Sequence, residues 1–260
     1  MVPTVFPLLA ALSVLASPAS GDRGVVIRFQ ETGGAATFTS QGNRLRIETS
    51  GAARRVTLFD GDAKELVELD PAARTYRVST QADARAMSVQ LDAMLSNLPP
   101  QQRALVEAEL RKQRAAPTPP TYEATGKSDS VAGFRCDGYR VLRDGKVREE
   151  GCFIPWAASP VTREDLKGLL AFARFMDEFA ANMSGGRAGG NGLGDQFTRA
   201  PGFPALIQDV AGDGQRTDRE RLVSVERASV AAEAFVVPSG YARVERSGPG
   251  GGAGGERPRP

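Results

Sequence analysis

The chain contains no histidine, and it has only two cysteines and one tryptophan. Without histidine, Ser-His-Asp and Cys-His catalysis and histidine-containing zinc sites are excluded. Basic and acidic residues nearly cancel at a net charge of +2, so strong electrostatic capture of nucleic acid is not expected. The composition therefore excludes histidine-dependent sites, and the sequence as a whole leads us to expect no catalytic residue, no metal site and no cofactor.

Long apolar runs are also scarce. The longest extends from about Val5 to Ala16, and it is too short to cross a bilayer, which takes about 20 residues as a helix. Small residues follow it, and cleavage near Ala19 or Gly21 is expected, so residues 1–21 are predicted to be a secretory signal peptide. A buried N-terminal helix is the alternative.

These features predict a mature protein in the periplasm or outside the cell. No cysteine follows the apolar run, so a lipid anchor is not expected, and no second run approaches spanning length. About 240 residues remain after cleavage, enough for one domain with a substantial core.

Both cysteines, Cys136 and Cys152, flank the turn "LRDGK". The segments on either side alternate in character as paired strands do. A three-residue loop, Arg143-Asp144-Gly145, would place the cysteines directly opposite each other, about 4.5 to 5.5 Å apart, within reach of a disulfide. A two-residue Asp-Gly turn would offset them by one position.

A structural disulfide is the interpretation favoured for this pair in an oxidising compartment. Zinc would need more clustered ligands, and a catalytic dithiol would more often be a short C-x-x-C motif. The same register predicts a buried face, which comprises Tyr139, Val141, Val147 and Phe153. It places Arg140, Arg148 and Glu150 on the other face with the disulfide.

Residues 24–80 alternate between short apolar segments and turn residues. This pattern predicts an antiparallel meander in which one face of the sheet packs inward. Together with the hairpin and the strand signals after residue 202, it predicts an α+β fold in which residues 22–246 form one antiparallel domain.

Two segments change to a helical period, residues 82–115 and residues 162–183. Pro99-Pro100 divides the first, and Thr162 with Asp165 forms a capping box before the second. Either helical segment could cover the sheet, and the second helix of the first segment, roughly Gln101 to Arg114, could also be a movable lid. Their apolar stripes are candidates for core or for the lining of an apolar cavity, and they include Leu91, Met94, Leu169, Phe172, Met176 and Phe179.

Two glycine-rich segments complete the chain. The loop at 184–195 lacks the lysine of a phosphate-binding motif and is a weak candidate for one. Residues 247–260 are rich in glycine, proline and charge and are predicted to be a disordered tail.

The middle segment "YEATGKSDSVAGFRCDGYRVLRDGKVREEGCFIPW", with Gly133, Tyr139, Pro155 and Trp156, resembles a family of exported bacterial domains of unknown function. The segments "DGDAKELVELDPAARTY", "GFP" and "FVVPSGY" carry the same resemblance. In organisation, that family is similar to the LolA, LolB and LppX-type periplasmic carriers. The resemblance implies an incomplete β-barrel with helices covering or plugging its concave face, and a lipid or lipoprotein as ligand.

Three functional hypotheses follow. The first is a non-catalytic exported protein that binds a lipid or another apolar ligand in the half-barrel. The second is an envelope module that binds a protein partner, and the sequence does not indicate its oligomeric state. The third is a hydrolase that uses Glu149 and Glu150, but adjacent strand residues point to opposite faces, so no enzyme activity is expected.

Overall fold

The computed structural model describes residues 23–51, 54–113, 119–183 and 198–245. The predicted signal peptide, the loop at 184–195 and the tail at 247–260 lie outside these residues. Within them, no helix has the length and apolar character that a membrane span requires.

Twelve strands form one sheet. In chain order they are β1 (Arg23–Glu31), β2 (Gly34–Gln41), β3 (Arg44–Thr49), β4 (Arg55–Asp60), β5 (Glu65–Asp70), β6 (Thr75–Thr80), β7 (Thr121–Val131), β8 (Phe134–Arg143), β9 (Lys146–Pro155), β10 (Gly202–Val210), β11 (Arg216–Ser229) and β12 (Ala242–Arg243). The α-helices are α1 (Gln81–Ser96), α2 (Pro100–Gln113) and α3 (Lys167–Met183), and two short 3-10 helices are η1 (Trp156–Ala158) and η2 (Ala232–Phe235).

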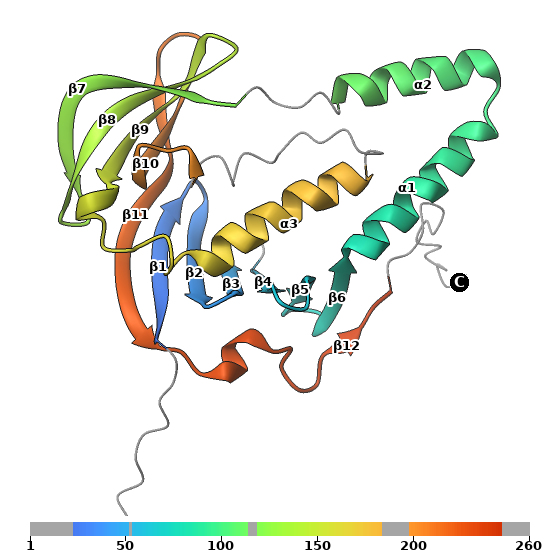
Figure 1. Ribbon diagram of the computed structural model, residues 1–260, viewed down its shortest axis with the longest axis horizontal. Helices are drawn as coiled ribbons and strands as arrows, with labels where there is room; N and C mark the ends of the chain where they lie inside the picture. The colour runs from blue at the N-terminus through green and yellow to red at the C-terminus, as the bar shows by residue number, and fades with distance from the viewer. Residues whose placement is uncertain (1–22, 52–53, 114–118, 184–197, 246–260) are drawn as a thin grey trace, which may run out of the picture.

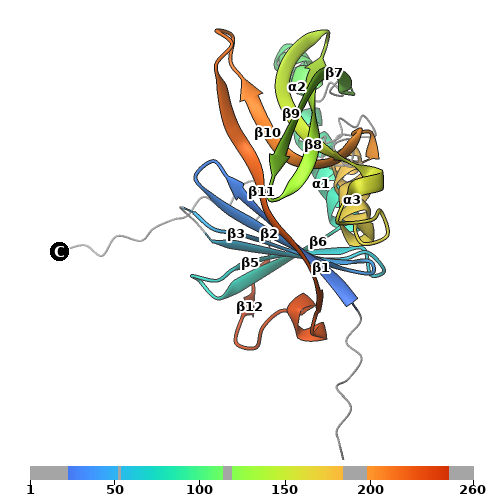
Figure 2. The ribbon, with the colours of Figure 1, turned by 90° about the vertical axis from the view of Figure 1, so that its left-hand side faces the viewer.

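The order across the sheet is β12-β6-β5-β4-β3-β2-β1-β11-β10-β9-β8-β7. All neighbours are antiparallel except β12, which pairs with β6 in parallel. The sheet bends between its two halves, so β2 to β6 lie beneath α3 while β7 to β11 rise beside it (Figures 1 and 2). The prediction of an α+β fold on an antiparallel sheet that does not close is confirmed.

Helix α3 occupies the concave side of the first half of the sheet. Its apolar stripe buries Leu169, Phe172, Phe175 and Phe179, and the rings of Phe172 and Phe175 lie 5.6 and 5.3 Å from that of Phe59 on β4. A helix stripe packed on a sheet is how two layers close around one core.

The segment before α3 makes the expected reciprocal hydrogen bonds of a capping box. The Thr162 N–H and hydroxyl both donate to the Asp165 carboxylate at 2.7 Å, and the Asp165 N–H donates to the Thr162 hydroxyl at 3.2 Å. Turns follow, and the α-helix itself begins at Lys167. Arg227 on β11 donates to both Asp165 oxygens at 2.7 and 2.8 Å, which anchors this end of α3 to the sheet.

Helices α1 and α2 form what we call the helical arm. At its base, Ala84 is fully buried. The Gln81 amide donates to the Phe175 carbonyl at 2.9 Å and accepts from Asn182 at 2.8 Å. The rest of the arm extends away from the sheet (Figure 1), so only its base is part of the core.

The predicted register of the β8–β9 hairpin is wrong. The turn has two residues, Asp144 and Gly145, both in the left-handed region at φ 52° and 69°, and Arg143 pairs with Lys146. A bulge then shifts the register, so Cys152 lies opposite Gly138 and not Cys136. The bulge keeps the two cysteines on the same face, diagonal to each other.

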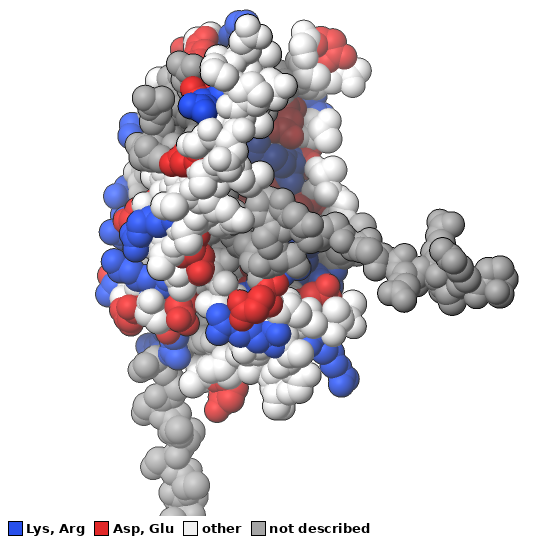
Figure 3. Space-filling model, turned by 90° about the vertical axis from the view of Figure 1, so that its right-hand side faces the viewer, with Lys and Arg blue, Asp and Glu red and all other residues white. Residues whose placement is uncertain are grey.

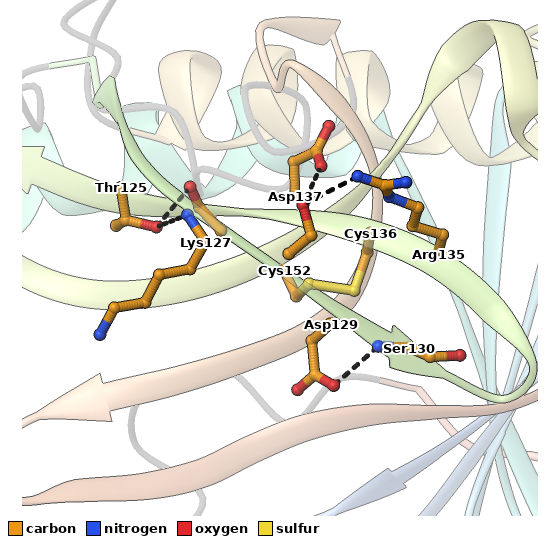
Figure 4. Close-up of a disulfide and its surroundings, with 10 residues drawn as sticks. Thr125, Lys127, Asp129, Ser130, Arg135, Cys136, Asp137 and Cys152 are labelled. Carbon is orange, nitrogen blue, oxygen red and sulfur yellow. Dashed lines mark hydrogen bonds between the residues drawn. A yellow bond between two sulfur atoms is a disulfide. The ribbon is translucent and has the colours of Figure 1, made fainter.

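The disulfide itself is present, with the two cysteine Cα atoms 5.3 Å apart (Figure 4). Both cysteines are buried in the main core, although they share a strand face with Arg140 and Glu150 further along. Val141 and Phe153 are buried and Tyr139 packs against them as predicted, but Val147 is exposed. The bulge lies between Val147 and Glu149, so it moves Val147 to the opposite face.

Candidate functional site

The apolar residues proposed to line a cavity fall into two groups. Leu169, Phe172 and Phe179 on α3 are buried in the core, with Met176 packed against it. On α1, Leu91 is half-buried and Met94 is 47 % exposed. The α3 side chains thus fill the concave side of the first half of the sheet themselves, whereas the α1 side chains lie on the arm.

The residues of the family-like motif occupy structural positions. Gly133 follows Ala132 in the β7–β8 turn, where both residues have positive φ, 82° and 52° respectively. The Tyr139 ring packs at 5.8 Å on Phe153. Pro155 ends β9, and the Trp156 indole N–H donates to the Ala200 carbonyl at 3.2 Å.

Exposed large apolar side chains gather on the helical arm. Seven such side chains occur among the described residues, and four of them lie on α1 or α2: Val89, Met94, Leu105 and Val106. Leu105 is 74 % and Val89 is 70 % exposed. Figure 3 looks onto this side of the molecule, where uncharged surface extends over the arm between scattered charges.

The corner between α1 and α2 is fixed by Arg103. Its guanidinium donates to the carbonyls of Leu95, Ser96 and Leu98 at 2.9, 2.6 and 3.3 Å. These carbonyls belong to the last turn of α1 and to the segment directly after it, and the Leu95 carbonyl also accepts the Leu98 N–H at 3.1 Å. Arg103 therefore holds α2 at a defined angle to α1, although α2 makes its substantial contacts with α1 alone.

A groove of about 710 Å³ crosses β4, β5 and β6. Its lining includes Arg54, Arg55, Arg77, Glu68 and Asp70. Glu68 is the cross-strand neighbour of Arg77, one Asp70 oxygen accepts the N–H groups of Ala72 and Ala73, and Arg54 pairs with Glu48 at 3.0 Å. Arg54 thus has an ion-pair partner, Glu68 has an oppositely charged cross-strand neighbour, and Asp70 is hydrogen-bonded within its own turn.

The carboxylates considered for catalysis form ion pairs with arginines of β11. Glu150 accepts two hydrogen bonds from Arg216 at 2.7 and 2.9 Å, and Glu149 accepts one from Arg219 at 2.9 Å. The bonds from Arg216 lower the pKa of Glu150 despite its partial desolvation. Among the described residues, no group of three or more His, Cys, Asp or Glu side chains is placed to hold a metal ion.

The exposed side of the arm was not predicted from the sequence, which indicated one apolar stripe that includes Leu91 and Met94. A second series, Ala82, Ala86, Val89 and Ala93, recurs at the same helical spacing, and it could have been found from that spacing. No periodic signal marks Leu105, because the apolar pattern of α2 is weak.

No family model and no curated protein matches the chain. Solved structures do match it. An uncharacterised conserved protein from Thermus thermophilus is similar in structure, with 8 % identity, coverage of 87 % of this chain and 92 % of that one, and a TM-score of 0.44.

Structures of MucB are also similar. The complex of MucA and MucB from Pseudomonas aeruginosa matches with 12 % identity over 82 % of this chain and 54 % of that one, at a TM-score of 0.34. A further crystal structure of MucB matches with 14 % identity over 86 % and 61 %, at a TM-score of 0.35. This chain thus spans little more than half of the MucB chain, and at these scores the likeness carries no functional argument.

Proposed function

We propose that the protein is an exported, non-catalytic binding module that docks a protein partner on α2. The observation that supports this most is the exposure of Leu105 and Val106 on a helix whose substantial contacts, among the described residues, are with α1. An isolated helix of this length is marginal in water, because most helical stability comes from packing. A helix held out with apolar side chains exposed therefore gains stability when a partner covers it.

Arg103 makes α2 suitable as a docking element. Because its hydrogen bonds fix the corner of the arm, little conformational freedom is lost when a partner binds. The fully buried centre of a protein interface is more apolar than its solvent-accessible polar rim, so Leu105 and Val106 would lie at the centre. On α2 that rim is supplied by exposed polar residues such as Gln101, Gln102 and Glu109.

Lipid carriage, as in LolA-like carriers, was the first hypothesis from the sequence. The filling of the concave side by α3 side chains argues against it, because Phe172, Phe175 and Phe179 occupy the place that an acyl chain would need. A carrier of this design would require α3 to leave the sheet. The protein interaction on α2 needs no such movement.

Enzyme activity is not part of the proposal. A general acid must hold a proton near neutral pH, and a lowered pKa keeps the Glu150 carboxylate ionised there. Its neighbour Glu149 is engaged by a different arginine, Arg219. The two carboxylates act as members of cross-strand ion pairs and do not converge on a common point.

Site-specific photo-crosslinking in cells that produce the protein tests the proposal. A photoreactive amino acid at position 105 should give one dominant protein adduct. The same group at position 223 on β11 is the control, since Val223 is also apolar and 53 % exposed. It should give no adduct of that mass.

The variant Leu105→Glu should abolish capture of the same partner at a second arm position, Val106, while the thermal midpoint stays unchanged. Equal adducts from positions 105 and 223, or adducts only with lipid, would count against a protein-docking role for α2.

A further inference from the structure

We propose that the side of α1 that faces away from α3 is a self-association surface, and that its occupant is the same side of α1 in a second copy of this chain. The surface consists of Ala82, Ala86, Val89 and Ala93, flanked by Arg85 and Asp92. It is separate from the α2 surface proposed to bind a protein partner.

Helix α1 is apolar on two opposite sides. One side carries Ala84, which is buried in the core with α3 residues, and at 100° per residue the half-buried Leu91 and Leu95 lie on the same side. At 100° per residue, Ala82, Ala86, Val89 and Ala93 lie on the other side, and all four are exposed. A helix that is apolar on both sides is normally covered on both.

The spacing of these four residues, four, three and four positions, is that of a helix-to-helix seam. Val89, 70 % exposed, stands at the middle of this series. The alanines on either side let the backbone of a second helix approach closely, so Val89 would lose most of its exposed area in a pair.

The charges beside the seam select the partner. Arg85 and Asp92 lie on the same flank of it, seven residues apart, and neither has an ion-pair partner among the described residues. In an antiparallel two-fold pair centred near Val89, Arg85 lies next to Asp92 of the second copy, and the same contact occurs twice. The flank is therefore complementary to itself.

Measurement of the dimer dissociation constant by sedimentation equilibrium of the full mature chain tests this inference. Wild type should dimerise more tightly at low salt than at high salt, since exposed ion pairs are screened. Arg85→Glu or Asp92→Arg alone should weaken the dimer about tenfold, because two attractive contacts become repulsive.

The double variant Arg85→Glu with Asp92→Arg should restore wild-type dimerisation, which a loss of folding could not do. Val89→Glu should abolish it, while Val223→Glu on β11 should leave it unchanged. A chain that stays monomeric at all accessible concentrations would overturn the inference. So would a dimer whose dissociation constant is the same in wild type and in the charge-reversal variants. Neither result bears on α2, because crosslinking at position 105 reports on that surface separately.

Discussion

Gly168 allows α3 to lie directly against the sheet. A Cβ atom added there would stand 2.4 Å from the Arg44 carbonyl oxygen and 3.1 Å from the Ser40 hydroxyl. The carbonyl belongs to the backbone of β3 and cannot move aside without disturbing the strand. The position thus determines how closely the helix approaches, and with it the burial of the phenylalanine stripe.

Gly168→Ala should therefore destabilise the fold by about 1 to 3 kcal/mol, the usual effect of overpacking, in spite of the better helix propensity of alanine. Urea denaturation would measure the change. Gly212→Ala is the matched control, because nothing lies within 4 Å of a Cβ atom there. Equal midpoints for the two variants would contradict this view of α3.

The Asp165 carboxylate gives the anchoring of α3 a pH dependence. Burial disfavours its charged form, but hydrogen bonds from Thr162 and Arg227 outweigh this and lower its pKa below the ordinary value. A lowered pKa in the folded state means that the carboxylate stabilises the fold above its unfolded pKa, about 3.9. That contribution is lost as the pH falls through the folded pKa.

Asp165→Asn should thus lower the free energy of unfolding at pH 7, and the difference from wild type should shrink below about pH 4. Urea titrations between pH 7 and pH 3 would show this convergence. A difference that stays constant over the whole range would mean that the charge of Asp165 is not what anchors α3.

At the scale of elements, the β8–β9 hairpin shows what a sequence can and cannot specify. The alternation of residues predicted two paired strands, and the compartment predicted the disulfide. The register was not predictable from the turn alone, because both a two-residue and a three-residue loop fit "RDG". The bulge beyond the turn, which sets Cys152 opposite Gly138, leaves no distinct mark in the sequence.

Replacement of both cysteines by alanine should lower the free energy of unfolding by about 3 kcal/mol on the chain-entropy model, since the bond closes a loop with a sequence separation of 16. Denaturation of the double variant and of oxidised wild type would give this difference. Because both sulfur atoms are buried, mild reductant should leave the folded wild type unchanged. Rapid reduction without unfolding would contradict this placement.

Strand β7 lies at the edge of the sheet, where an unprotected strand invites pairing with other chains. Its pairing with β8 is interrupted between Ala124 and Ser128. Beyond the interruption, the Ser130 N–H donates to the Asp129 carboxylate at 2.7 Å (Figure 4). Charge and interruption together protect this edge, which is why α2 and not β7 is proposed as the docking element.

Asp129→Val should accordingly make the protein aggregate at lower concentration, with light scattering as the measurement. Glu68→Val is the control, because Glu68 is an exposed charge on β5, which is paired on both sides. Similar scattering from both variants would mean that Asp129 does not protect the edge.

At the scale of the whole molecule, the sequence predicted the class of fold. It did not predict which sides of α1 and α2 remain exposed. Antiparallel order followed from short strands joined by tight turns, and α3 followed from one strong apolar stripe. The exposed apolar side chains of the arm could not be predicted, because a periodic pattern shows which side of a helix is apolar but not whether a neighbouring element covers it. The exposed positions of Val89 and Leu105 are properties of the assembled sheet and helices.

The central claim is that α3 fills the concave side of the sheet and leaves α2 to bind a protein. Native mass spectrometry of the protein released from cells without detergent tests it most directly, with wild type and Leu105→Glu side by side. The account predicts that wild type retains a protein partner and no lipid, and that the variant loses this partner. Bound acyl lipid that remains in both proteins, with no partner in either, would contradict it.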